Sequence, residues 1–235
     1  MKFITAVAAA IILSGCGPSP SSNNSGPSGS VAAARPARPA EKPDQPLLEK
    51  RGENTYRVAA LGITVDAPAG WYVADSELMG KLMDEGVEIS GANLNAGEKA
   101  AVDSAMARTV TLFSFLEVPP GSPREYIPAA MGIAEDISML PGVTRGKDYF
   151  FHARKTMEMS AIPIVTSDVF AERMIDGRSF DRMDAQVTAP GGLDILQRYY
   201  AARRGNNMII FVQSYRTDEE LAQLDAVLDG IKLDW

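Results

Sequence analysis

Apolar and polar positions alternate along most of the C-terminal half of the chain, which is the pattern of strands with one buried face. Four runs of this kind predict strands, at residues 165–174, 180–188, 193–202 and 208–215. Asp176-Gly177 predicts a type I′ hairpin between the first two, because both central positions of that turn need positive φ. Pro190-Gly191-Gly192 and residues 204–207 predict the remaining turns. The segment therefore predicts an antiparallel meander.

The spacing of apolar residues changes to three and four after the last of these strands. Thr217 opens a capping box, and the helix that follows carries Leu221, Leu224 and Leu228 on one face. A short strand at residues 231–233 can end the chain. A meander followed by a helix is an α+β arrangement, not a βαβ one.

The first half of the domain is patterned less strongly. It predicts strands at residues 56–60, 61–66 and 106–117. It predicts helices at residues 76–83, capped by Ser76, and 148–160, capped by Asp148. Residues 86–97 are predicted to form a loop that could contain a short strand.

Residues 122–138 support two assignments. A capping box at Ser122 and helical spacing of Ile127, Met131, Ala134 and Ile137 predict a helix. Pro128 opposes it, because proline removes a helical hydrogen bond and clashes with the preceding turn.

The order of these segments resembles the Mog1/PsbP-like superfamily. The resemblance rests on a strand that runs into a Pro-x-Gly-Trp turn at residues 63–71, an aromatic strand at 208–215, the Thr217 helix, and the final Ile231-Lys232-Leu233. It implies a central antiparallel sheet with helices on both faces, and a strand rather than a helix at 129–138. It also implies a non-enzymatic protein that binds a partner or helps an assembly. The superfamily pattern offers no catalytic or cofactor-binding residues that could be assigned to positions of this chain.

A different pattern opens the chain. One positive charge precedes an uncharged run of eleven residues, 3–13, which is too short to span a membrane and fits the apolar region of a secretory signal. It ends in Leu13-Ser14-Gly15-Cys16, which resembles the lipobox of bacterial lipoproteins. The resemblance implies cleavage between Gly15 and Cys16 and acylation of Cys16, and Gly17 in place of Asp implies the outer membrane, facing the periplasm. The alternative is an ordinary signal peptide with an incidental cysteine.

The composition then changes to serine, proline, glycine, asparagine and alanine, without an apolar pattern that could be buried. We therefore predict three parts: a signal peptide at residues 1–15, a lipidated disordered tether at 16–54, and one α+β domain at 55–235.

Charge and composition exclude several classes of function. The net charge of -7 disfavours nucleic-acid binding, which needs clustered Lys and Arg. One Cys rules out an internal disulfide, and one Cys with one His rules out the usual zinc sites. We expect no metal and no cofactor.

Few residues are candidates for chemistry. His152 is the single histidine and reads as a surface residue on a helix. The acidic pairs Asp181 with Asp184, and Glu135 with Asp136, could in principle serve a glycan hydrolase, although thirty acidic residues make some neighbours inevitable. Trp71 and Trp235 could each anchor a binding groove.

Three functions remain open. The leading hypothesis is a non-enzymatic binding or assembly module, held at the membrane by a lipid and facing a protein partner of the cell envelope. The alternatives are a hydrolase of envelope glycan with two carboxylates and a carrier of a small ligand. A carboxylate pair in a cleft would favour the hydrolase, and an enclosed apolar cavity the carrier.

Overall fold

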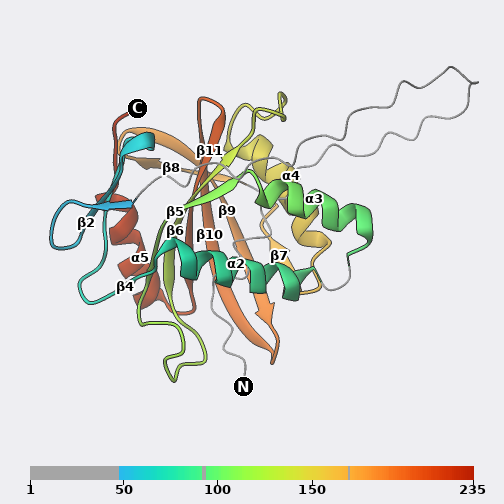
Figure 1. Ribbon diagram of the computed structural model, residues 1–235, viewed down its shortest axis with the longest axis horizontal. Coiled ribbons are helices and arrows are strands. Elements are labelled where there is room, and N and C mark those ends of the chain that lie inside the picture. Colours follow the sequence, from blue (N-terminus) through green and yellow to red (C-terminus); the bar gives the residue numbers. More distant parts are fainter. Residues whose placement is uncertain (1–47, 92–93, 169) are drawn as a thin grey trace, which may run out of the picture.

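The computed structural model describes residues 48–91, 94–168 and 170–235 (Figure 1). The predicted signal peptide, Cys16 and most of the predicted tether lie outside the described residues. The elements, in chain order, are β1 (Leu48–Lys50), β2 (Thr55–Val58), the 3₁₀ turn η2 (Ala59–Leu61), β3 (Ile63–Asp66), β4 (Tyr72–Val73), α2 (Ser76–Ser90), α3 (Ala96–Met106), β5 (Thr109–Leu116), β6 (Ala129–Asp136), α4 (Gly146–Glu158), β7 (Ile164–Thr166), β8 (Ala171–Ile175), β9 (Arg178–Ala189), β10 (Leu193–Arg204), β11 (Asn207–Tyr215), α5 (Asp218–Gly230) and β12 (Lys232–Leu233).

A large antiparallel sheet forms the centre of the fold, with the strand order β4-β5-β6-β11-β10-β9-β7, and β8 pairs with β9 beside β7. In its middle, Gly132 of β6 lies opposite Phe211 of β11. A side chain at Gly132 would place its Cβ 2.4 Å from Phe113, so the glycine makes room for that ring. The predicted α+β class with a central antiparallel sheet is confirmed.

A second, smaller sheet has the order β1-β2-β3-β12 and joins the two ends of the domain through the pairing of Leu233 with Ile63. Its edge strand β1 pairs Leu48 with Val58. Folded structure therefore includes Leu48, which the sequence assigned to the tether. The short β1 segment has too few residues to show an alternating pattern, and its partner β2 fixes it.

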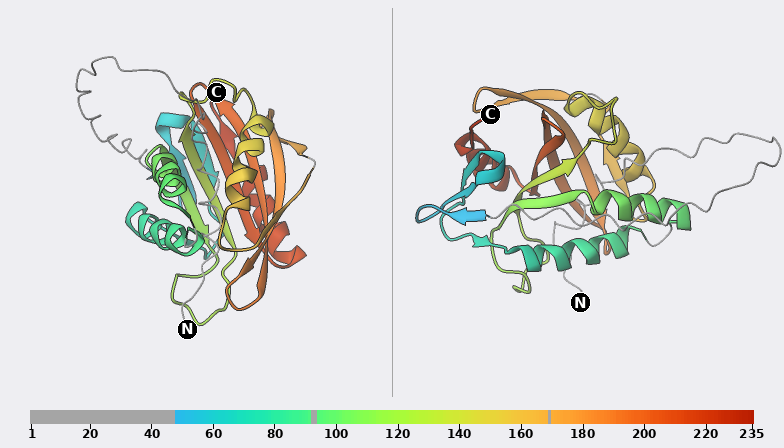
Figure 2. Two further views of the ribbon diagram at one scale, coloured as in Figure 1. Left: turned by 90° about the vertical axis from the view of Figure 1, so that its right-hand side faces the viewer. Right: turned by 45° about the horizontal axis from the view of Figure 1, so that its top comes forward.

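Two apolar cores lie on the two faces of the large sheet. Figure 2 shows that helices lie on both of these faces. Helices α2 and α4 cover one core, which contains Met79, Tyr149 and Tyr199. Helix α5 and the small sheet cover the other, which contains Ile63 and Leu224. Helices therefore pack on both faces, as the resemblance implied.

The C-terminal unit follows the sequence pattern closely. Thr217 Oγ1 accepts a hydrogen bond from the backbone N–H of Glu220 at 3.2 Å and caps α5. Leu224 and Leu228 are buried, while Leu221 is half-buried against the same core. Asp176 and Gly177 have φ of 44° and 76°, as a type I′ turn requires.

Residues 129–136 form the strand β6, so the strand assignment of this segment is confirmed. The helical spacing of apolar residues does not produce a helix here, because β6 pairs with β5 and β11 along its length. Ladders on both sides and burial on both faces outweigh a local preference.

Three sequence predictions are corrected. The loop predicted at 86–97 contains the end of α2 and the start of α3, which Asn95 caps by accepting from the backbone N–H groups of Gly97 and Glu98. The strand predicted at 165–174 is two strands, β7 and β8, because β9 pairs with each in turn. The helix predicted from Asp148 begins at Gly146, and Asp148 lies within its first turn.

Within the described ranges, every helix is too short or too polar to span a bilayer.

Candidate functional site

The acidic pairs proposed from the sequence do not face one another. Asp181 and Asp184 lie three positions apart on β9, so their side chains leave the sheet on opposite faces. Asp181 accepts from Arg145 Nε and from the backbone N–H of Lys147, both at 2.9 Å, on the α4 side. Asp184 accepts from Arg182 Nη2 at 2.9 Å. Neither carboxylate is placed to work with the other.

The adjacent pair Glu135 and Asp136 is separated in the same way by the alternation of β6. Glu135 is fully buried and accepts from Tyr149 Oη at 2.6 Å, with Arg108 Nη2 3.7 Å away. Burial raises the pKa of Glu135 to about 7, against the opposing effect of the Tyr149 hydrogen bond. Asp136 Oδ1 accepts from the backbone N–H of Ser138 at 2.8 Å.

His152 is exposed on α4, and its ring meets the edge of Phe151 at 5.6 Å between centroids. Among the described residues, no group of three or more His, Cys, Asp and Glu side chains could hold a metal ion.

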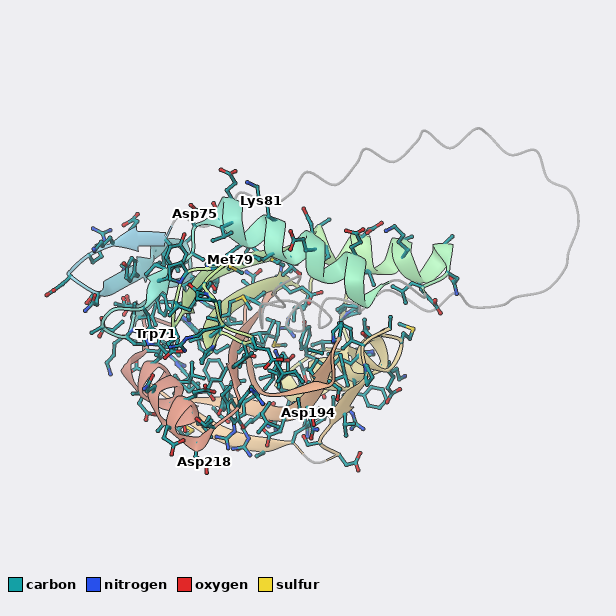
Figure 3. The ribbon with its side chains drawn as sticks, turned by 90° about the horizontal axis from the view of Figure 1, so that it is seen from below. Trp71, Asp75, Met79, Lys81, Asp194 and Asp218 are labelled. Atoms are coloured by element: carbon teal, nitrogen blue, oxygen red, sulfur yellow. The ribbon has the colours of Figure 1, made fainter. Side chains whose placement is uncertain are left out.

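Trp71 follows Gly70 in the Pro-x-Gly-Trp turn, where Gly70 has a φ of 80° that favours glycine. Its half-buried ring packs against the core under α5 and lines a shallow cleft with Glu117 and Gln223 (Figure 3). Its main contacts are thus with the core.

A cleft forms where β9 separates from β10. The two strands pair as far as Asp181 and Ala201, and beyond that point β9 keeps only its pairing with β8 on its other edge. Residues 178–180 of β9 and 202–204 of β10 therefore diverge, while β10 continues alongside β11. The gap has a volume of about 400 Å³ and is lined by Thr144, Arg145, Gly146, Glu172, Arg178, Ser179, Asp181, Ala201, Ala202, Arg203 and Trp235. We call it the arginine–tryptophan cleft.

The start of α4 closes one side of this cleft. Gly146 packs so tightly on β10 that a Cβ would lie 2.2 Å from the carbonyl oxygen of Ala201. Arg145 donates to both oxygens of Asp181 and, at 2.6 Å, to Glu172. These hydrogen bonds, first the one with Asp181, raise the pKa of Arg145. This wall of the cleft is closely packed, and its charges are already paired.

The other wall carries arginines whose charges are not paired. In the described residues, four arginines form no ion pair with another described residue, namely Arg178, Arg203, Arg204 and Arg216. Arg178 and Arg203 line the cleft, and Arg204 lies against the ring of Trp235, another lining residue. Arg203 donates to the carbonyl oxygens of Gly205 and Val143, and Arg204 to that of Ala60, so each is held in place by neutral partners.

Trp235 connects two of these arginines. The guanidinium carbons of Arg178 and Arg204 lie 5.6 and 5.9 Å from its ring centroid, within cation–π range. Its ring also approaches Phe180, at 6.4 Å. The cleft lining holds Arg145, Arg178 and Arg203 against the carboxylates of Glu172 and Asp181, and Arg204 adds a fourth guanidinium at the Trp235 ring. Asp176, which pairs with Lys232 outside the lining, also interacts electrostatically with Arg178. Guanidinium groups therefore outnumber carboxylates here, in a chain of net charge -7.

Sequence reasoning identified Trp235 as a possible groove anchor but missed the arginines. The adjacent Arg203-Arg204 was the one local signal for them. Which guanidinium groups lack a carboxylate depends on contacts between distant segments, and these become visible only in the fold.

A second cleft, of about 300 Å³, lies under the start of α2. Leu48, Tyr56, Val73, Met79, Leu112 and Phe113 give it apolar walls, and Asp75, Ser76 and Thr111 are its polar lining residues. Figure 3 shows Asp75 just before α2 and Met79 within it. Asp75 accepts from the backbone N–H of Leu78 at 2.8 Å and so caps α2, in place of the predicted Ser76.

No family model matches the chain, and no curated protein matches its sequence. Solved structures that it resembles include the cyanobacterial PsbP (CyanoP) of Synechocystis sp. PCC 6803, with a TM-score of 0.46, 13% identity, and coverage of 86% of this chain and 98% of that one. LpqN of Mycobacterium tuberculosis, described as involved in cell envelope biogenesis, matches with a TM-score of 0.38, 12% identity and coverage of 71% and 79%. PA94 of Pseudomonas aeruginosa, a putative regulator of unknown function, matches with a TM-score of 0.33, 18% identity and coverage of 48% and 73%. Likeness at this level carries no argument about function.

Proposed function

We propose that this chain is a lipid-anchored, non-enzymatic binding module of the bacterial cell envelope, and that the arginine–tryptophan cleft binds an anionic group of its ligand or partner. The observation that carries the proposal is the gathering of Arg178, Arg203 and Arg204, without carboxylate partners, around Trp235. Elsewhere in the described residues, arginines other than Arg216 are paired with carboxylates.

The chemistry of guanidinium supports an anionic ligand. Its planar array of donors matches the oxygens of a phosphate or carboxylate, and hydrogen bonds between charged groups are stronger than neutral ones. Neutral carbonyl oxygens hold Arg203 and Arg204, so the bound geometry is largely formed before the ligand arrives.

The anchor completes the proposal. Cys16 would hold the chain at the membrane, and residues 17–47 would separate the domain from it. A flexible chain of that length has an average end-to-end distance of roughly 30 Å. The cleft could then reach ligands some distance above the membrane surface.

The carrier alternative has one observation in its favour, which is the apolar cleft under α2. Its volume of about 300 Å³ is at the lower end of the range for small-ligand sites.

The test is a titration of the full-length chain in detergent with inorganic pyrophosphate. In a Trp71→Phe background, the fluorescence of Trp235 alone reports on the cleft. Arg178→Gln should weaken binding about tenfold or more, because a charged hydrogen bond is worth roughly 1.5–3 kcal/mol.

Arg216→Gln is the matched control. Arg216 is exposed, it likewise forms no ion pair with a described residue, and its loss changes the net charge equally. The proposal fails if pyrophosphate does not bind, or if the two variants weaken binding to the same degree.

A further inference from the structure

A groove beside the start of α4 extends the proposed binding surface. It has a volume of about 360 Å³ and is lined by Gly142, Lys147, Asp148, Phe151, His152 and Phe170. Lys147 links the two sites, because its backbone N–H donates to Asp181, which lines the arginine–tryptophan cleft. We call this second site the Phe151 groove.

The aromatic rings of the groove are held in position. Phe151 is 57% exposed, with Lys155 Nζ 4.5 Å from its ring centroid. Phe170 packs on the buried ring of Phe150 at 5.6 Å, and Arg154 approaches it at 6.0 Å. An exposed aromatic side chain offers a large contact area at little cost in conformational entropy, because it has only two χ angles.

We infer that the anionic ligand is a glycan, with its charged group in the arginine–tryptophan cleft and a sugar ring against Phe151 in the neighbouring groove. This inference rests on the proposed function. The two sites share no lining residue and adjoin at the start of α4, where Thr144 of the cleft hydrogen-bonds Asp148 of the groove. The ligand must therefore extend beyond a single anionic group.

The composition of the groove fits a sugar. The apolar CH face of a sugar ring packs on an aromatic ring because it leaves water there. Lys147 and His152 provide hydrogen-bonding groups at the margin, and Asp148 provides a carboxylate that hydroxyl groups can approach.

Asp148 also disfavours an acidic peptide. Its carboxylate already accepts from the backbone N–H of Thr144 at 3.0 Å, from Thr144 Oγ1 at 2.6 Å and from the backbone N–H of Arg145 at 3.2 Å. These hydrogen bonds, first that of the Thr144 hydroxyl, lower its pKa and keep it ionised. It would repel a second anion, whereas a neutral sugar ring carries none. The net charge of -7 likewise opposes a nucleic acid.

The experiment compares three probes on the full-length chain in detergent: aldotetraouronic acid, in which one uronic acid is joined to three neutral xylose rings, an end-blocked tetrapeptide of one glutamate and three serines with the same charge, and inorganic pyrophosphate. Aldotetraouronic acid should bind at least tenfold more tightly than the peptide. Phe151→Ala should weaken aldotetraouronic acid about tenfold and leave pyrophosphate unchanged, whereas Arg178→Gln should weaken both.

Met159→Ala is the control, because Met159 is also an exposed apolar residue at the end of the same helix, outside the groove. Equal binding of aldotetraouronic acid and the peptide, or an unchanged affinity of Phe151→Ala for aldotetraouronic acid, overturns the glycan inference while pyrophosphate binding still supports the cleft. If the parent chain does not bind pyrophosphate, the proposed function itself is overturned.

Discussion

The phenol of Tyr149 donates a 2.6 Å hydrogen bond to the carboxylate of Glu135 at a position where neither side chain is exposed. Burial raises the pKa of Glu135 from 4.5 to about 7, although this hydrogen bond and Arg108 both act to lower it. The group therefore binds its proton more tightly in the folded chain than in the unfolded one.

This raised pKa predicts a loss of stability with increasing pH. The contribution of Glu135 is fully present below about pH 4.5 and is lost as the pH rises through about 7. Over that window, unfolding in urea should show a decrease of up to about 3 kcal/mol in the free energy of unfolding from this group.

Glu135→Gln should remove this dependence, because an amide keeps the shape of the carboxyl group and does not titrate. Urea midpoints of the parent and the variant at pH 5 and pH 8 measure the difference. A parent chain whose stability relative to Glu135→Gln is the same at both values would contradict the raised pKa.

A second prediction concerns the packing of α5. Leu224 is fully buried in the core that α5 covers, so Leu224→Ala should cost about 2–5 kcal/mol once the cavity is included. Thr217→Ala removes one cap and should cost about 1 kcal/mol. Urea midpoints of the two variants give both values, and a Leu224→Ala variant as mild as Thr217→Ala would show that α5 does not depend on this contact.

The sequence predicted those elements whose local chemistry and tertiary contacts agree. Asp176-Gly177 and the Thr217 capping box are specified by residues within a few positions of each other, and both occur as expected. The Asn95–Glu98 capping box indicates the start of helix α3. The sequence analysis nevertheless missed this helix, because its apolar residues are few and small. The break between β7 and β8 has no local signal, since β9 decides it by pairing with both.

The candidate site was predictable only in part, for the same reason. An aromatic residue such as Trp235 can be recognised as a possible anchor from the sequence. By contrast, Arg178 and Arg203 meet only where β9 and β10 separate, and the sequence on either side gives no sign of that point.

A third prediction concerns the anchor, which lies outside the described residues. Cys16→Ser should abolish labelling with a clickable fatty acid and leave unprocessed precursor, because the thiol accepts the lipid in the lipoproteins that this segment resembles. Gly17→Ala is a suitable control, since it leaves the thiol in place. Normal lipid labelling of Cys16→Ser would refute the lipoprotein assignment.

The last prediction concerns the contact that shapes the arginine–tryptophan cleft. Gly146 has no room for a side chain, because a Cβ would lie 2.2 Å from the carbonyl oxygen of Ala201 and 3.0 Å from Asp181 Cβ. Gly146→Ala must therefore push α4 away from β10, at a cost of about 1–3 kcal/mol in the free energy of unfolding. Because Arg145 and Lys147 would move with the helix, pyrophosphate binding should weaken as well.

Gly142→Ala is the control, since its Cβ would have no heavy atom within 4 Å, and it should change stability by less than about 0.5 kcal/mol. Urea denaturation and the pyrophosphate titration measure both effects, and equal stability of the two variants would mean that α4 does not rest on β10 at this point.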